Sequence, residues 1–271
     1  MPALYVVATP IGNLEDITLR AIRTLKEVQL IAAEDTRKTR RLLAACNIKT
    51  PTTSYYEHNK LTKLDFILER LQTQDVALVS DAGMPGISDP GFELISAAIQ
   101  RHIPLVPIPG PSVLITALVL SGLPTHSFLY LGFLPRKEGE RRRLLQSRSE
   151  ESATLVLFES PHRILHSLRD ILEILGDREI AVGRELTKIY EEIFRGTVGE
   201  ALRHFSAPKG EFTLVIAGKP KGTPADLDSE TEKRLKKMHR SGITAKQAIA
   251  RLAGDTGLPR KKLYQAWLKN K

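Results

Sequence analysis

The chain is poor in cysteine: Cys46 is the only one among its 271 residues. One cysteine cannot form a disulfide within the chain, and it cannot supply a zinc site built from several thiolates. The seven histidines do not gather at the spacing of metal ligands, and a His-Glu-x-x-His motif is missing. We therefore expect a protein of a reducing compartment, the cytoplasm, without a metal centre.

Long apolar runs are also missing, apart from the uncharged stretch Ile103–Pro124. Four prolines break the first half of this stretch, so we interpret it as a buried strand, a turn and a buried helix rather than a membrane span. The opening residues lead directly into the short apolar run Leu4–Ala8 and do not resemble a signal peptide. The sequence therefore predicts no membrane association.

Three common motifs of nucleotide sites and nucleophilic enzymes are absent. No Gly-x-Gly-x-x-Gly follows the first predicted strand, and there is neither a Gly-x-x-x-x-Gly-Lys-Ser/Thr loop nor a Gly-x-Ser-x-Gly segment. The sequence therefore lacks the motifs that usually indicate a dinucleotide site, a phosphate-binding loop or the nucleophile turn of a serine hydrolase.

The charge of the chain is concentrated at its C-terminal end. The net charge is +9, and residues 221–271 contain thirteen Lys and Arg against five Asp and Glu, or +8. Residues 1–220 therefore carry only +1. A localised cationic segment favours an extended polyanion over a small acidic substrate.

The first 218 residues alternate short β-branched runs with amphipathic stretches. Leucine and isoleucine spacing predicts helices over Leu61–Leu71 and Ile164–Leu175. Alternating strands and helices indicate an α/β fold with mainly parallel sheets covered on both faces. The predicted strands are Leu4–Ala8, Gln29–Ala33, Val76–Ser80, Leu105–Ile108, Phe128–Gly132, Thr154–Glu159, Glu179–Val182 and Phe212–Ala217.

Two boundaries divide the chain into three predicted domains. One lies near Gly122–Pro124, after a helix that begins at Ser112, and the other is the turn-rich segment Gly218–Asp228. We expect an N-terminal α/β lobe of residues 1–122, a second α/β lobe of residues 123–220 and a small all-α domain of residues 221–271.

The C-terminal domain is predicted to contain three helices: Glu230–His239, Thr244–Ala253 with Thr244 as its N-cap, and Pro259–Lys269. The last two flank Gly254–Gly257, a spacing that resembles a helix-turn-helix. We interpret this unit as a domain that binds RNA through its shape and its phosphates rather than through contacts with the bases. A dimer support or a solvated tail is the alternative.

Three predicted strands are followed by loops rich in glycine and proline: Thr9–Asp16, Asp81–Gly91 and Pro109–Ser112. Ligands of parallel α/β sheets bind beyond the carboxyl ends of the strands. Stiff loops with little side-chain bulk suit a preformed pocket whose contacts are largely main-chain. In such a pocket Asp81 and Asp89 could balance a sulfonium or accept hydrogen bonds from a ribose. Tight turns with helix caps are the alternative.

Six segments of the body carry a more specific signal. They are Val7–Asp16, Ala33–Arg37, Ser80–Gly91, Pro107–Ser112, Phe158–Arg163 and Arg184–Lys188. Together they closely resemble the small-subunit ribosomal RNA methyltransferase I family, which is similar in fold to the tetrapyrrole methylases. The resemblance runs from about Leu4 to the C-terminus, in order and without a large gap.

This resemblance implies a homodimeric, cytoplasmic enzyme that methylates the ribose 2′-hydroxyl of a cytidine in the decoding region of small-subunit ribosomal RNA. It implies S-adenosylmethionine as the cofactor, held between two α/β lobes of a tetrapyrrole-methylase-like body. The residues then expected to bind the cofactor are Pro10, Gly12, Asn13, Asp81, Gly83, Pro85, Gly86, Gly110 and Ser112.

A ribose hydroxyl is a poor nucleophile, so a general base or an alkoxide stabiliser is expected. The candidates are Lys188, Glu185 and Asp35, which follow predicted strands. Lys188 could act as a base if buried, because burial lowers a lysine pKa. If exposed, it would attract phosphate or stabilise the alkoxide, and Glu185 or Asp35 would be the base. A surface ion-pair set without chemistry is the alternative.

The RNA-contact candidates are cations beside the predicted cleft and in the C-terminal domain. They are Arg37, Arg136, Arg141, Arg142, Arg163, Arg260, Lys261 and Lys262. Their partner would be free small-subunit ribosomal RNA or the assembled subunit. Two other functions stay open: a small-molecule methylase acting on tetrapyrroles, and a DNA-binding regulator that senses a small ligand.

Overall fold

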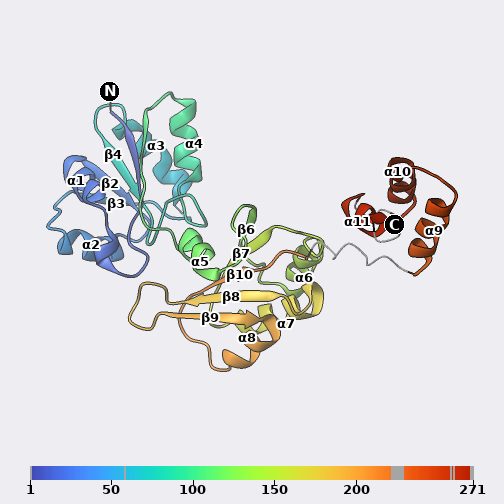
Figure 1. The fold of residues 1–271 in the computed structure, drawn as a ribbon. Helices are drawn as coiled ribbons and strands as arrows, with labels where there is room; N and C mark the ends of the chain where they lie inside the picture. The colour runs from blue at the N-terminus through green and yellow to red at the C-terminus, as the bar shows by residue number, and fades with distance from the viewer. Residues whose placement is uncertain (1, 58, 221–228, 257, 259, 269–271) are drawn as a thin grey trace. The chain divides into compact units, whose positions relative to one another are not determined.

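The computed structural model describes residues 2–57, 59–220, 229–256, 258 and 260–268. Contacts divide the chain into two compact units, Met1–Gly218 and Lys219–Lys271 (Figure 1). The larger unit, called the body below, holds two five-stranded sheets, and the smaller unit is helical.

The first sheet of the body is entirely parallel, with the strand order β3-β2-β4-β1-β5. Four of its strands confirm the sequence prediction, and β3 was missed because three polar residues give no hydrophobic pattern. The strands are β1 (Leu4–Val7), β2 (Leu30–Ala33), β3 (Thr52–Ser54), β4 (Val76–Val79) and β5 (Leu105–Ile108).

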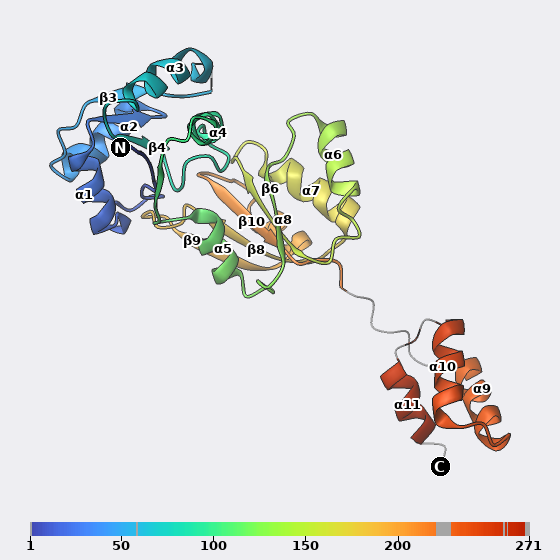
Figure 2. The ribbon, with the colours of Figure 1, turned by 90° about the horizontal axis from the view of Figure 1, so that it is seen from above.

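Helices cover both faces of this sheet, as expected for parallel strands. Helices α1 and α2 lie on one face, and α3 and α4 lie on the other (Figures 1 and 2). Neighbouring side chains therefore enter different cores, Leu78 the core under α3 and α4 and Val79 the core under α1 and α2. The helices are α1 (Leu19–Glu27), α2 (Thr36–Ala45), α3 (Lys60–Arg70) and α4 (Phe92–Gln100), with a short 3₁₀ turn, η1 (Leu14–Asp16).

The second sheet is mixed, with the order β6-β7-β10-β8-β9. Only β6 and β7 pair in parallel, while β10 lies antiparallel between β7 and β8, and β8 and β9 form a hairpin. A mainly parallel sheet is therefore found in the first lobe alone. The strands are β6 (Phe128–Phe133), β7 (Thr154–Glu159), β8 (Glu179–Arg184), β9 (Glu192–Thr197) and β10 (Phe212–Ile216).

Helix α5 (Val113–Ser121) packs on one face of the second sheet, where Leu114 and Leu118 contact Val156 and Val215. The boundary expected at residue 122 would place this helix in the first lobe, whereas its buried face belongs to the second. The opposite face of the sheet is covered by α6 (Glu138–Gln146), α7 (Ile164–Leu175) and α8 (Val198–His204).

The smaller unit contains α9 (Ser229–Arg240), α10 (Ala245–Thr256) and α11 (Arg260–Leu268), in agreement with the three helices predicted there. The hydroxyl of Thr244 accepts a hydrogen bond from the Gln247 amide at 3.4 Å, which confirms the N-cap. The three helices share a core of their own, built around Leu235, Leu252 and Trp267. No helix of the described residues is long and apolar enough to cross a membrane.

Two of the arginines expected to contact RNA hold α6 against α7 instead. Arg141 donates from Nε to Asp170 Oδ2 at 2.6 Å, and both side chains are only 8% exposed. Arg142 bridges Asp170 and Glu173. The five cations of Arg136–Arg143 do not reveal in the sequence the carboxylates that lie 28 to 31 residues further along the chain. This geometry corrects the expectation for Arg141 and Arg142.

We predict that Asp170→Ala lowers the free energy of unfolding by about 3–5 kcal/mol, because it leaves the buried Arg141 guanidinium without its charge partner. Denaturant unfolding measures this loss. The matched control is Glu173→Ala, which removes a carboxylate that is 65% exposed and should cost far less, because solvent screens an exposed pair. Equal losses in the two variants would contradict the assignment of a buried ion pair.

Candidate active site

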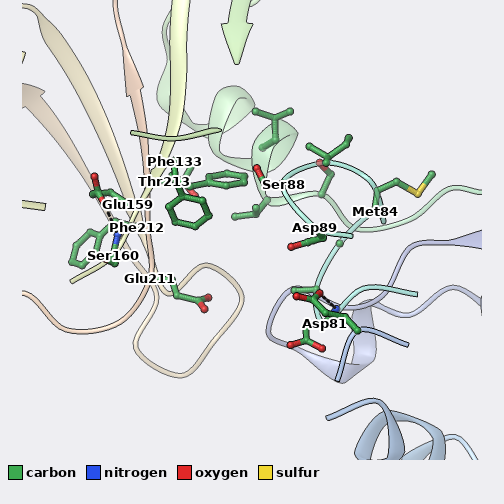
Figure 3. Close-up of a pocket in the computed structure, with 18 of the residues that line it drawn as sticks. Asp81, Met84, Ser88, Asp89, Phe133, Glu159, Ser160, Glu211, Phe212 and Thr213 are labelled. Atoms are coloured by element: carbon green, nitrogen blue, oxygen red, sulfur yellow. Dashed lines mark hydrogen bonds between the residues drawn. The ribbon is translucent and has the colours of Figure 1, made fainter. Parts of the chain in front are cut away.

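A cavity of about 450 Å³ lies where the carboxyl ends of the first sheet meet the second sheet within the body (Figure 3). One wall comes from the loop after β4, and the opposite wall comes from the ends of β6 and β7 and the start of β10. Its apolar lining consists of Met84, Ile87, Val113, Leu114, Phe133, Phe158 and Phe212. We call this the donor cavity.

The donor cavity has an acidic rim made of Glu34, Asp81, Asp89 and Glu211. Figure 3 shows three of these carboxylates, Asp81, Asp89 and Glu211. Asp81 Oδ1 accepts a hydrogen bond from the Asp35 amide at 3.0 Å, and its Oδ2 pairs with Lys38 Nζ at 2.7 Å. The Asp81 amide in turn donates to Glu34 Oε2 at 3.1 Å. These contacts tie the ends of β2 and β4 together around the carboxylates.

Crowding of these carboxylates shifts their protonation. Burial, reinforced by the neighbouring charges of Glu34 and Asp81, raises the pKa of Asp89 to about 7, although a hydrogen bond with Ser80 opposes the shift. Burial likewise raises the pKa of Glu34. The cavity therefore gains from a positive charge placed among these groups.

The loop after β4 has the stiffness expected from its glycines. Thr9 and Gly83 exchange two backbone hydrogen bonds of 2.9 and 3.0 Å, with Gly83 at φ 75°. At Gly91, φ is 153°, and a Cβ would lie 3.0 Å from the Gly86 nitrogen. A side chain at either position would strain the turn, so the loop needs glycine there. Ser88 also contacts the Tyr130 hydroxyl of β6, which links the loop to the second sheet.

A second cavity, of about 820 Å³, lies between the loop after β1 and the loop between β8 and β9. We call it the acceptor hollow; its lining residues are Gly12, Asn13, Leu14, Glu15, Glu185, Thr187, Lys188, Ile189 and Tyr190. The Asn13 amide donates to Thr187 Oγ1 at 3.1 Å, so residues 174 positions apart join the two loops.

Lys188 connects the two cavities. Its Nζ lies 2.9 Å from Glu185 Oε1 and 2.9 Å from Glu211 Oε2, and Glu211 lines the donor cavity. Burial alone would lower the pKa of Lys188, but hydrogen bonds to the two carboxylates outweigh it and raise that pKa. Burial works against ionisation of Glu185, yet the bonds from the Glu211 amide and from Lys188 lower its pKa. Lys188 is thus an ammonium and Glu185 a carboxylate.

Asp35, the third catalytic candidate, has a structural position. It is the N-cap of α2, accepting from the Arg37 amide, and it also pairs with the Arg37 guanidinium at 3.0 Å. The side-chain hydrogen bond from Arg37 is the largest cause that lowers the pKa of Asp35 to about 2. So weak a base is unsuited to take a proton from a hydroxyl.

The nine cofactor candidates divide between the cavities. Asp81, Gly83 and Ser112 line the donor cavity, while Gly12 and Asn13 line the acceptor hollow. Gly12 packs against Lys188, since a Cβ there would lie 2.5 Å from Lys188 Cγ. The remaining four candidates line neither of these two cavities: Pro10, Pro85, Gly86 and Gly110.

Sequence reasoning missed the wall of the donor cavity that the second sheet supplies. Phe133, Phe158 and Phe212 end or begin strands there, and Glu211 precedes β10. The antiparallel insertion of β10 between β7 and β8 brings Glu211 to the site.

Among the expected RNA contacts, Arg163 donates hydrogen bonds to Glu159 Oε2 at 3.0 Å and to the Leu134 carbonyl.

The fold resembles that of a solved methylase. The native form of uroporphyrin III C-methyl transferase from Thermus thermophilus matches 79% of this chain and 97% of its own, with a TM-score of 0.58 and 20% sequence identity. This likeness concerns the fold alone. A family model described as tetrapyrrole (corrin/porphyrin) methylases matches residues 3–202.

Relatives named ribosomal RNA small subunit methyltransferase I are much more similar in sequence. The protein from Synechocystis sp. is 50% identical over 98% of this chain and 97% of its own length. The protein from Thermotoga maritima is 51% identical over 81% of this chain and all of its own length. The chain belongs to the ribosomal RNA small subunit methyltransferase I family. The predicted family is thereby confirmed.

Methyltransferases of this family use S-adenosylmethionine, whose sulfonium supplies an electrophilic methyl group. The donor cavity suits that molecule. Its acidic rim, in which burial and neighbouring carboxylates raise the pKa of Asp89, suits the sulfonium, and its apolar wall of three phenylalanines suits the adenine. The volume of about 450 Å³ lies in the range of small-molecule sites.

We predict that affinity for S-adenosylmethionine rises about tenfold between about pH 6 and about pH 8. Because the pKa of free Asp89 is about 7 and a bound cation favours its ionised form, binding releases a proton, and the gain levels off above that pKa. Calorimetry in buffers of different ionisation enthalpy measures the release. Asp89→Asn should abolish it, whereas Asp65→Asn on α3 should not. A pH-independent affinity of the wild-type protein would refute the assignment.

Proposed function

We propose that this methyltransferase transfers the methyl group of S-adenosylmethionine to the 2′-hydroxyl of a cytidine ribose in the decoding region of small-subunit ribosomal RNA. The names of its relatives support small-subunit ribosomal RNA as the substrate. The observation that carries the proposal is the position of Lys188, whose ammonium joins Glu185 in the acceptor hollow to Glu211 at the donor cavity.

The residues at this junction suit methyl transfer to a hydroxyl. The Glu185 carboxylate would take the hydroxyl proton as the oxygen gains the methyl group that a sulfonium bound in the donor cavity would supply. The Lys188 ammonium holds the same oxygen and stabilises the negative charge that develops on it. We favour Glu185 over Asp35 as the base, because Glu185 lines the acceptor hollow beside Lys188, whereas Asp35 lines neither cavity and caps α2. Lys188 is assigned the role of stabiliser rather than base, because its pKa is raised.

We predict that Lys188→Gln lowers the rate of methyl transfer by about 100-fold or more, while the affinity for S-adenosylmethionine changes little, because one preorganised donor to the reacting oxygen is lost. Labelled cofactor is offered with small ribosomal subunits, free small-subunit RNA, a porphyrinoid precursor or duplex DNA. Label on the ribose of small-subunit RNA supports the proposal. Label on the porphyrinoid, or tight binding of duplex DNA without transfer, would instead favour one of the two functions left open by the sequence.

We propose that the smaller unit and exposed cations of the body hold the RNA by its phosphates. Exposed cations of the smaller unit include Lys233, Lys237, Arg240 and Arg260, and those of the body include Arg37 and Arg136. Lys261 and Lys262 belong to α11, but their side chains lie outside the described residues. Arg141, Arg142 and Arg163 are left out of the proposed surface, because their carboxylate partners hold them at 8%, 33% and 23% exposure. Arg37 is kept because its side chain is 86% exposed although it pairs with Asp35.

We predict that removing residues 219–271 weakens RNA binding and flattens its salt dependence, since each lost phosphate contact lowers the slope by roughly one. Cofactor affinity should stay within about twofold, because both cavities belong to the body. The double variant Lys233→Glu and Lys237→Glu reverses two exposed charges of α9 in the full chain and should act in the same direction. If the salt dependence of RNA affinity is undiminished in both proteins, the body and not the smaller unit makes the phosphate contacts.

We propose further that two copies of the chain associate in the cytoplasm, where the reduced state of the lone Cys46 and the ribosomal substrate place the enzyme. Helix α5 supports the pairing, because Ile115, Val119 and Leu120 are exposed on the side opposite its buried face. A contiguous apolar surface of this kind favours association. Sedimentation with the mass of two chains would agree with it, and a single-chain mass would not.

A further inference from the structure

The loop between β8 and β9 displays two large apolar side chains at its tip. Ile189 is 95% exposed and Tyr190 is 76% exposed, although Leu186 in the same loop is buried in the core under α5. A loop that leaves an aromatic residue in solvent while burying its neighbour is positioned for binding rather than for packing.

The same loop is held rigidly. Glu185 and Thr187 both have positive φ values, 50° and 66°. The turn is fixed by hydrogen bonds from the Thr187 amide to Glu191 at 2.6 Å and from the Lys188 amide to the Glu185 carbonyl at 2.9 Å. Non-glycine residues in this conformation persist only where the surroundings impose it. The exposed tip is therefore preorganised.

Polar groups that suit a nucleotide surround this tip in the acceptor hollow. The Lys188 ammonium and the Glu185 carboxylate lie at the inner end of the hollow, next to Glu211 of the donor cavity. Leu14 and Glu15, from the loop after β1, line the same hollow. Single-stranded RNA is bound by such combinations, in which an aromatic ring stacks on a base while polar groups meet the sugar.

We propose that the acceptor hollow receives the target nucleotide in an unstacked form, and that Tyr190 stacks on its base so that the ribose hydroxyl reaches Lys188 and Glu185. This inference rests on the proposed function and specifies where the RNA enters. Tyr190 is thus a substrate-binding residue that takes no part in proton transfer.

The test compares Tyr190→Ala, Tyr190→Phe and the control Leu61→Ala, which removes a 71% exposed side chain of α3 that lines neither cavity. Methylation of small subunits is measured at saturating S-adenosylmethionine. We expect Tyr190→Ala to raise the KM for the subunit about 5- to 100-fold, the range found for lost base stacking. Tyr190→Phe, which keeps the ring, and Leu61→Ala should stay within about twofold of the wild type. Cofactor affinity, measured by calorimetry, should be unchanged in all three.

A second measurement separates this inference from the proposed function. Ultraviolet cross-linking of the wild-type protein to small-subunit RNA should leave a nucleotide on the peptide that contains Tyr190. An unchanged KM in Tyr190→Ala, or cross-links confined to other peptides, would overturn the stacking role while ribose methylation by the wild type still stood. A fall in sedimenting mass for Tyr190→Ala would overturn it as well, because the tip would then be a contact between two copies. If the wild type methylates no RNA, the proposed function fails. The cross-linking result alone then shows whether Tyr190 contacts RNA.

Discussion

The ion-pair group of Lys188, Glu185 and Glu211 is the interaction on which both cavities depend. Lys188 and Glu185 come from the turn after β8, and Glu211 is the residue before β10. The Glu185 amide donates to the Glu211 carbonyl at 3.0 Å, and the Glu211 amide donates to Glu185 Oε1 at 2.8 Å. The group is held from both sides, since Gly12 packs on the Lys188 stem and Gly210 on Glu185, where a Cβ would clash in each case. A side chain at either glycine would displace the charged atoms themselves, and a displacement of about 1 Å can cost about 100-fold in rate.

The charges on the two sides of this group are unequal, and the inequality separates donor from acceptor. The donor cavity gathers carboxylates around Asp89, whose pKa is raised to about 7 chiefly by burial, while Lys38 in the same lining pairs with Asp81. At the Lys188 end of the acceptor hollow, Glu185 is balanced by that ammonium, and Glu15 is the other carboxylate of the lining. A neutral hydroxyl can enter such a balanced site without the desolvation penalty of a lone charge. The arrangement thus favours a sulfonium on one side and a ribose on the other.

The parts of this site that could be predicted from the sequence follow strands of the parallel sheet. The rule that ligands bind beyond parallel strand ends led to the loops at Gly12 and Asp81, because β-branched runs and glycine-proline turns are local signals. Glu211 and the aromatic wall were not predictable, because antiparallel insertion of β10 is a long-range choice that leaves no local pattern. The exposed arginine pattern of α6 failed for a similar reason: whether Arg141 meets solvent or Asp170 depends on how α6 packs on α7.

The division between body and smaller unit has a physical consequence for how the enzyme works. Every residue that lines either cavity belongs to the body, which carries almost no net charge, while the smaller unit supplies most of the positive charge. The whole length of the Thermotoga maritima relative matches 81% of this chain. The body makes up a similar share of the chain. Catalysis needs shape and two charged groups at fixed distances, whereas attraction to a polyanion needs only charge nearby. A separate cationic unit can therefore raise the encounter rate with RNA without altering the geometry at Lys188.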